Sequence, residues 1–249
     1  MSPALGQKNK SFHKYYAGWL ICRMRGGMRG KMKQIIKSYL VFASFLYKIL
    51  LLLVLPVVLL GIQVFASAAL QGTTIPLSIF MLILVEVPGD ILVLGGIQEK
   101  NSEKMDYLKT SPRGMKVMKN VLVMDLVRRF LACVIIFALS RLIMSAFGAA
   151  PEAEKLAGPG ALLLAVLLSY TLAVLGIFIS RFCSLLWINL LCSYIGAIAG
   201  IILFFIGAGN YFPLLLPMMN AALGILAVGL SILTVKIAMM KVEGSYYDR

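Results

Sequence analysis

The sequence predicts an all-α membrane protein. We expect a six-helix transmembrane bundle with an N-terminal interfacial amphipathic helix and a short cytoplasmic helix between two of the spans. Of the 249 residues, 61% are hydrophobic and only 14% are charged, and the mean hydropathy is +0.93. A soluble domain cannot bury so much apolar surface. Most of the chain also falls into apolar runs of roughly 20 residues, the length at which a helix crosses the hydrocarbon core of a bilayer.

The first 40 residues form a basic segment that we expect to lie at the cytoplasmic membrane surface. Two apolar stripes recur there at helical spacing and are separated by Gly26-Gly27. The stripes consist of Phe12, Tyr15, Tyr16, Trp19 and Leu20, followed by Met28, Met32, Ile35, Ile36 and Tyr39. An apolar face opposite a basic face is typical of a helix that lies among anionic lipid headgroups. The alternative, a disordered basic tail, does not explain the regular apolar spacing.

Residues 41–241 form the predicted transmembrane domain, and residues 242–249 form a short cytoplasmic tail. A charged cytoplasmic loop, residues 98–120, separates the second span from the third. The expected spans are residues 41–66, 75–97, 122–147, 161–181, 184–206 and 217–240.

The orientation follows from lysines and arginines near the span ends, because cytoplasmic loops carry an excess of these residues. Nine lie in the first 40 residues and six lie in the charged loop. With six crossings, both groups fall on the same side as Arg181, Lys241 and Arg249, and only Lys155 falls on the opposite side. We therefore expect a multi-pass protein of the cell membrane with both termini in the cytoplasm. The net charge of +14 reflects this topology and does not indicate nucleic-acid binding.

Two carboxylates interrupt the second predicted span. Glu86 and Asp90 are four residues apart, on one helix face, around Pro88-Gly89. Carboxylates at this depth are unfavourable unless they are paired, protonated or hydrated. Because Lys48 lies about as far from the cytoplasmic face as Asp90 does, we predict that these two residues pair.

The third predicted span carries further charges. We expect Arg141, which lies deep in this span, to face Glu86, whereas Asp125, Arg128 and Arg129 lie nearer the interface, where long side chains reach the headgroups. Two interpretations of the intramembrane charges remain open at this point. They form either a structural network of ion pairs or a path for protons or substrate.

The charged loop contains signals for a short, rigid helix. Ser102 can cap a helix on which Met105 and Leu108 share a face. Ser111 and Pro112 are typical of the first residues of a new helix, which we expect to run into the third span. A short amphipathic helix held between two membrane helices is suited to the groove of a partner protein.

No signature of an enzyme is present. The single histidine, His13, lies outside the predicted spans, so the membrane domain has no histidine for a metal site or a catalytic triad. The segment Gly26 to Met32 differs from a phosphate-binding loop in its spacing and in its last residue. We expect no catalytic residue, metal or cofactor in this chain.

Three segments give the chain a resemblance to the type 2 ABC exporter permeases. These permeases are the bacterial six-span subunits of multidrug, lantibiotic-immunity and polysaccharide exporters. Residues 11–40 resemble the interfacial connecting helix of that family. The stretch Glu99 to Pro112, with its acidic start, its Tyr-Leu pair and its Ser-Pro step, is similar to the family's coupling segment. The stretch Tyr211 to Pro217 is similar to the external hairpin that contains proline, although it is short here.

The resemblance implies a specific function. The chain would be the permease subunit of an ATP-driven exporter, and two permease chains, identical or different, would work with two separate ATPase chains that bind the ATP. The residues that would sit in a cleft of the ATPase are Met105, Tyr107, Leu108, Ser111 and Pro112. The exported substance stays open.

Two other functional classes compete with this interpretation. The first is an ion-coupled secondary transporter or channel that uses Lys48, Glu86, Asp90 and Arg141 as a relay, although no inverted repeat is visible. The second is a membrane scaffold whose basic N-terminal segment gathers lipids or partner proteins.

Overall fold

The computed structural model describes six helices and no strand. The described residues are 53–70, 74–98, 114–147, 158–182, 186–209 and 214–247, with the single positions 35, 36, 39, 49 and 156. The helices are α4 (Leu55–Leu70), α5 (Ile75–Gln98), α7 (Gly114–Phe147), α9 (Pro159–Phe182), α10 (Leu186–Ala208) and α11 (Leu215–Tyr247). The predicted all-α class is therefore confirmed for this part of the chain.

Four of these helices contain segments that are long and apolar enough to cross a membrane. The segments are Gly114–Phe147, Pro159–Ile179, Trp187–Ala208 and Leu215–Gly244. In α4, the apolar segment Leu55–Ala68 is shorter than a full span. The structure thus supports a membrane-embedded protein. The count of six spans stays a prediction, because it requires that α4 and α5 also cross the membrane.

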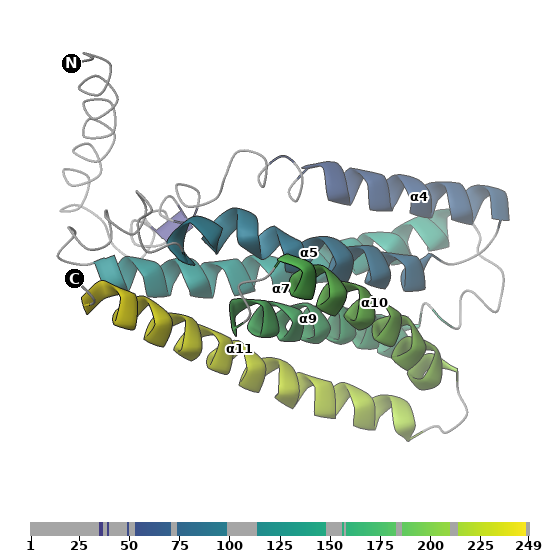
Figure 1. Cartoon of the computed structure of the whole chain (residues 1–249). Helices are drawn as coiled ribbons and strands as arrows, with labels where there is room; N and C mark the ends of the chain where they lie inside the picture. The colour runs from purple at the N-terminus through teal and green to yellow at the C-terminus, as the bar shows by residue number, and fades with distance from the viewer. Residues whose placement is uncertain are drawn as a thin grey trace, which may run out of the picture.

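Successive helices run in opposite directions (Figure 1). The last residues of α5 and α9, the first residues of α7 and α10, and the end of α11 lie at one end of the bundle. The last residues of α4, α7 and α10 and the first residues of α5, α9 and α11 lie at the other end. This alternation brings the end of α5 and the start of α7 to the same end of the bundle as the end of α11.

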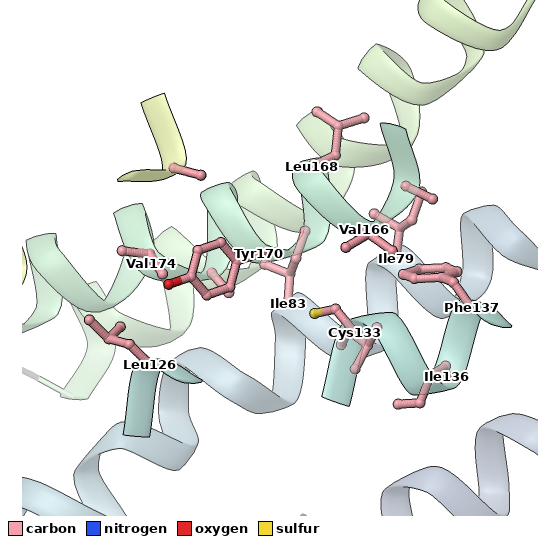
Figure 2. Packing of buried hydrophobic residues seen from close by; sticks show 14 of the residues in the cluster. Ile79, Ile83, Leu126, Cys133, Ile136, Phe137, Val166, Leu168, Tyr170 and Val174 are labelled. Atoms are coloured by element: carbon pink, nitrogen blue, oxygen red, sulfur yellow. The ribbon is translucent and has the colours of Figure 1, made fainter. Parts of the chain in front are cut away.

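Helix α9 lies at the centre of the bundle, because it packs against α5, α7, α10 and α11. Its side chains Leu164, Leu168 and Val174 are completely buried. Figure 2 shows the core that these helices share, where Ile83 of α5 and Cys133 of α7 lie close to Tyr170 of α9. In lipid such packing stabilises the bundle through close van der Waals contact, because the hydrophobic effect does not drive helices together there.

Two contacts of Tyr170 connect three helices in this core. Phe130 of α7 meets the ring of Tyr170 edge-on, with ring centroids 5.4 Å apart. The Tyr170 hydroxyl lies 2.7 Å from the Ser231 hydroxyl of α11. A tyrosine hydroxyl buried in the membrane needs such a partner. This hydrogen bond therefore helps to fix the position of α11 along α9.

Helix α7 is continuous from Gly114 into the third predicted span, which agrees with the helix that the sequence predicts at the end of the charged loop. One helix boundary differs from the sequence prediction. Helix α11 continues to Tyr247, although the sequence predicts a polar tail from residue 242. Ala238 and Val242 extend the buried stripe of α11 by one more turn, and this packing explains why the helix runs past the apolar span.

Glycine allows α5 and α9 to approach closely. A Cβ atom added at Gly176 of α9 would lie 2.8 Å from Cγ2 and 3.2 Å from Cγ1 of Val87. Val87 is completely buried, and a β-branched side chain has few alternative rotamers. The methyl group of an alanine at residue 176 would therefore push the two helices apart.

We expect Gly176→Ala to lower the free energy of unfolding by about 1–3 kcal/mol, which is the usual cost of overpacking a core. Gly229→Ala in α11 is the matched control, because a Cβ atom there meets nothing within 4 Å. This control should be neutral or stabilise by up to about 1 kcal/mol. Unfolding of both purified variants in detergent tests the prediction, and an equal response of the two would contradict it.

Candidate functional site

Five charged side chains meet between α5 and α7, and we call them the charge cluster. They are Glu86 and Asp90 of α5 and Asp125, Arg128 and Arg129 of α7, and all five are buried. The spacing of four residues in α5, and of three and four residues in α7, puts each set on one helix face. The two faces are complementary in charge.

Arg128 and Glu86 form a two-pronged ion pair. Nη1 of Arg128 donates to Oε1 of Glu86 at 2.8 Å, and Nη2 donates to Oε2 at 2.5 Å. This parallel geometry is the strongest arrangement available to a guanidinium and a carboxylate. Nε of Arg128 also lies 3.8 Å from Oδ1 of Asp125.

Arg129 lies at the centre of the cluster, and its side chain is only 1% exposed. Its Nε donates to Asp125 at 2.8 Å, and its Nη2 lies 3.3 Å from Asp90. Its Nη1 donates both to the Glu86 carboxylate, at 2.7 Å, and to the Glu86 backbone carbonyl, at 2.5 Å. A single side chain thus bonds to all three acids, and its bond to the carbonyl also engages the backbone of α5 in the turn that precedes Pro88.

Tyr39 connects the predicted amphipathic segment to the same cluster. Its hydroxyl donates to Oδ1 of Asp125 at 2.9 Å, and its ring is buried. The end of the N-terminal segment is thereby fixed to α7 by a hydrogen bond to a charged group.

We expect Tyr39→Phe to lower the free energy of unfolding by about 1.5–3 kcal/mol, the usual value of a hydrogen bond to a charged group. Tyr194→Phe in α10 is the control, because Tyr194 is 52% exposed and the loss of an exposed hydroxyl has a small effect. Chemical unfolding of both variants measures the difference. Equal stabilities would show that the bond from Tyr39 to Asp125 contributes nothing.

The arrangement favours a mechanical role for the charge cluster. Taking isolated charges into a low-dielectric interior is very unfavourable, so each charge needs the others to stay buried. The guanidinium groups of Arg128 and Arg129 already occupy the carboxylate oxygens, and the described residues contain no group of ligands that could hold a metal ion. The cluster therefore joins α5 and α7 into one unit.

The structure corrects the predicted partner of Glu86. Arg141 is exposed on α7, and Glu86 pairs with Arg128 and Arg129 instead. Arg128 and Arg129 are buried, so the interpretation that they extend to the interface is also wrong. Hydropathy estimates the depth of a residue but not the side of the helix on which it lies. The spacing of Asp125, Arg128 and Arg129, which matches that of Glu86 and Asp90, is the signal that identifies the pairing.

Other predicted site residues lie outside the described part of the chain. Lys48 is one of them, and its pairing with Asp90 stays a prediction. The predicted ATPase-coupling residues, Met105, Tyr107, Leu108, Ser111 and Pro112, are the others.

Comparison of the chain with protein-family models, with curated proteins and with solved structures finds no match.

Proposed function

We propose that the chain is the permease subunit of an ATP-binding-cassette exporter, and that it forms the translocation path and couples to a separate ATPase subunit. The observation that carries the proposal is the position of the charge cluster. It joins α5 to α7, which are the two helices connected by the segment that resembles the coupling segment of type 2 exporter permeases.

The cluster would connect the proposed coupling segment rigidly to the bundle, through α5 and α7. The segment follows Gln98, the last residue of α5, and precedes Gly114, the first residue of α7. If an ATPase moves this segment, a flexible connection to the two helices would dissipate the movement. Because Arg128 and Arg129 both bind Glu86, α5 and α7 would move together. Both helices pack on α9, which would carry the movement into the rest of the bundle.

The proposal includes an assembly and an orientation. A second permease chain completes the working unit, ATP is bound by the partner ATPase, and both termini face the cytoplasm. Lys116 and Lys119 support this orientation, because they are exposed in the first turns of α7, at the end of the bundle that would then lie at the cytoplasmic surface.

A carrier driven by an ion gradient is the competing function. Such a carrier needs carboxylates that change protonation or bind the ion during transport. Here Glu86 and Asp90 interact with the guanidinium groups of Arg128 and Arg129, and this pairing favours the structural interpretation of the charges.

Site-specific photo-crosslinking in the host tests the proposal. We expect p-benzoylphenylalanine incorporated at Leu108 to form an adduct with a protein that contains an ATP-binding cassette, identified by mass spectrometry. The same amino acid at Leu163 is the control and should give no such adduct. Leu163 is exposed in the first turns of α9, a helix that begins at the opposite end of the bundle (Figure 1). A folded chain without an ATPase adduct from residue 108 would contradict the coupling assignment.

A further inference from the structure

Helix α4 buries two polar side chains that the charge cluster does not use. Gln63 and Ser67 are both 0% exposed. They lie four residues apart, on the same buried face as Leu55 and Leu59. Within the described part of the chain, neither amide atom of Gln63 and no atom of the Ser67 hydroxyl has a hydrogen-bond partner. Burial of an unpaired amide is unfavourable, and lipid offers it no alternative partner.

Helix α4, which carries these groups, packs closely against fewer of the described helices than any other helix does. Its main packing partner among the described helices is α7, whereas α9 packs against four helices. The opposite face of α4 is open, and Phe65 on that face is 66% exposed. Figure 1 shows α4 at the edge of the bundle. Separation of α4 from α7 would expose Leu55 and Leu59 but would leave the packing of α9 against α5, α10 and α11 in place.

The chemistry of this boundary is polar but neutral. Gln63 offers one donor group and one acceptor, and Ser67 adds a hydroxyl one turn away. Helix α7 itself holds a buried neutral hydroxyl, that of Ser140, which is 1% exposed and donates to the carbonyl of Ile136. The described ion pairs of the charge cluster connect α5 with α7 or lie within α7, and they do not involve α4. Neutral hydrogen-bonding groups next to apolar side chains are suited to an uncharged polar headgroup.

We infer that α4 and α7 separate to form a lateral binding site for an amphipathic molecule with a neutral, hydroxyl- or amide-bearing headgroup. Gln63 and Ser67 bond to the headgroup, while the apolar part of the molecule stays in contact with lipid. This inference rests on the proposed function, since the molecule bound here is the exported one. In the closed arrangement the two side chains are sealed and unpaired, so ligand binding satisfies them and favours the open state.

Cysteine accessibility in proteoliposomes tests the site. Single cysteines are introduced as Gln63→Cys and, for the control, Val64→Cys into a chain whose four native cysteines are replaced by serine or alanine. Val64 is the neighbouring residue and is 36% exposed on the open face of α4. We expect a charged, water-soluble thiosulfonate to modify the cysteine at 63 faster than the one at 64 by about tenfold or more, because thiolates form in water and not in lipid. Equal rates would overturn the inference.

Protection by added amphiphiles tests the class of ligand. Decyl glucoside, below its micellar concentration, should slow the modification of a cysteine introduced as Leu59→Cys, which lies on the same buried face and leaves Gln63 and Ser67 in place. Decyltrimethylammonium at the same concentration has the same chain and a cationic headgroup, and it should not protect. Equal protection by both compounds, or protection by neither, would contradict a site for neutral headgroups.

A substitution at Gln63 gives an independent readout, because it changes the stability of the chain. Gln63→Leu keeps the approximate size of the side chain and removes the unpaired amide. We expect it to raise the melting temperature of the purified chain and to slow modification of a cysteine introduced as Ser67→Cys, because it favours the closed boundary. A lower melting temperature would show that the amide is satisfied in the closed bundle, and the inference would fail. These measurements use the chain without an ATPase, so they test the site separately from the crosslinking at residue 108; a positive result here together with no ATPase adduct there would keep the site and reject the exporter.

Discussion

Replacement of Arg129 by methionine is expected to lower the free energy of unfolding by about 3–5 kcal/mol, the usual cost of breaking a buried ion pair by removing one partner. Arg129 bonds to Asp125, to the carboxylate and backbone carbonyl of Glu86, and to Asp90. Without it, the buried acids keep their mutual repulsion and lose their central cation. Unfolding of the purified variant in detergent is the measurement.

Two further arginine variants make this test specific. Arg141→Met removes an arginine from an exposed position of the same helix and should change stability by less than about 0.5 kcal/mol. Arg129→Lys should give an intermediate loss, because a single ammonium group cannot reproduce the fork that Nε, Nη1 and Nη2 form. If Arg129→Met and Arg141→Met behave alike, the charge cluster does not hold the bundle together.

The second large effect is expected at the coupling segment. If the proposed coupling segment docks on an ATPase, the double substitution of Tyr107→Asp with Leu108→Asp should weaken that association by about tenfold or more, because it would place charged groups in the apolar centre of the interface. The stability of the bundle itself should not change, since these residues lie in the connection between α5 and α7. Co-purification of the ATPase with each variant measures the effect.

Ser102→Asp is the matched control for the coupling segment. It adds a negative charge to the same stretch, but aspartate is as good a helix cap as serine. It should therefore leave association intact. If the double variant binds the ATPase as well as the control does, Tyr107 and Leu108 do not form the docking surface.

The sequence predicts the helical architecture well because its signal is strong. Apolar runs of the right length correspond to α9 and α10, whose ends fall within two residues of the predicted spans 161–181 and 184–206. The end of α11 is harder to predict, because Val242 continues the buried stripe among charged residues. The average hydropathy falls at this turn because of the charged residues, so the predicted span ends at residue 240 whereas the helix continues to Tyr247.

The candidate site is only partly predictable from the sequence. The position of Glu86 and Asp90 on one face of α5 follows from their spacing. Their partners depend on how α7 is rotated about its axis. The depth of Arg141 or Arg129 in the membrane does not reveal this rotation. Packing of α7 against α9 sets this rotation. Cys133 and Phe137 are buried in the core, and Arg129 is buried on the same face of α7 because the three residues are spaced by four. The bond between Tyr39 and Asp125 joins residues 86 positions apart and has no local signal.

The most direct test of the proposed function is purification of the tagged chain from its own host in mild detergent. The preparation is then assayed for a co-purifying ATPase and for ATP hydrolysis that vanadate inhibits. The exporter assignment predicts an ATPase subunit in equimolar amount with vanadate-sensitive activity. An intact bundle that carries no ATPase would contradict it and would favour an ion-coupled carrier, for which Glu86 and Asp90 would be the first residues to neutralise.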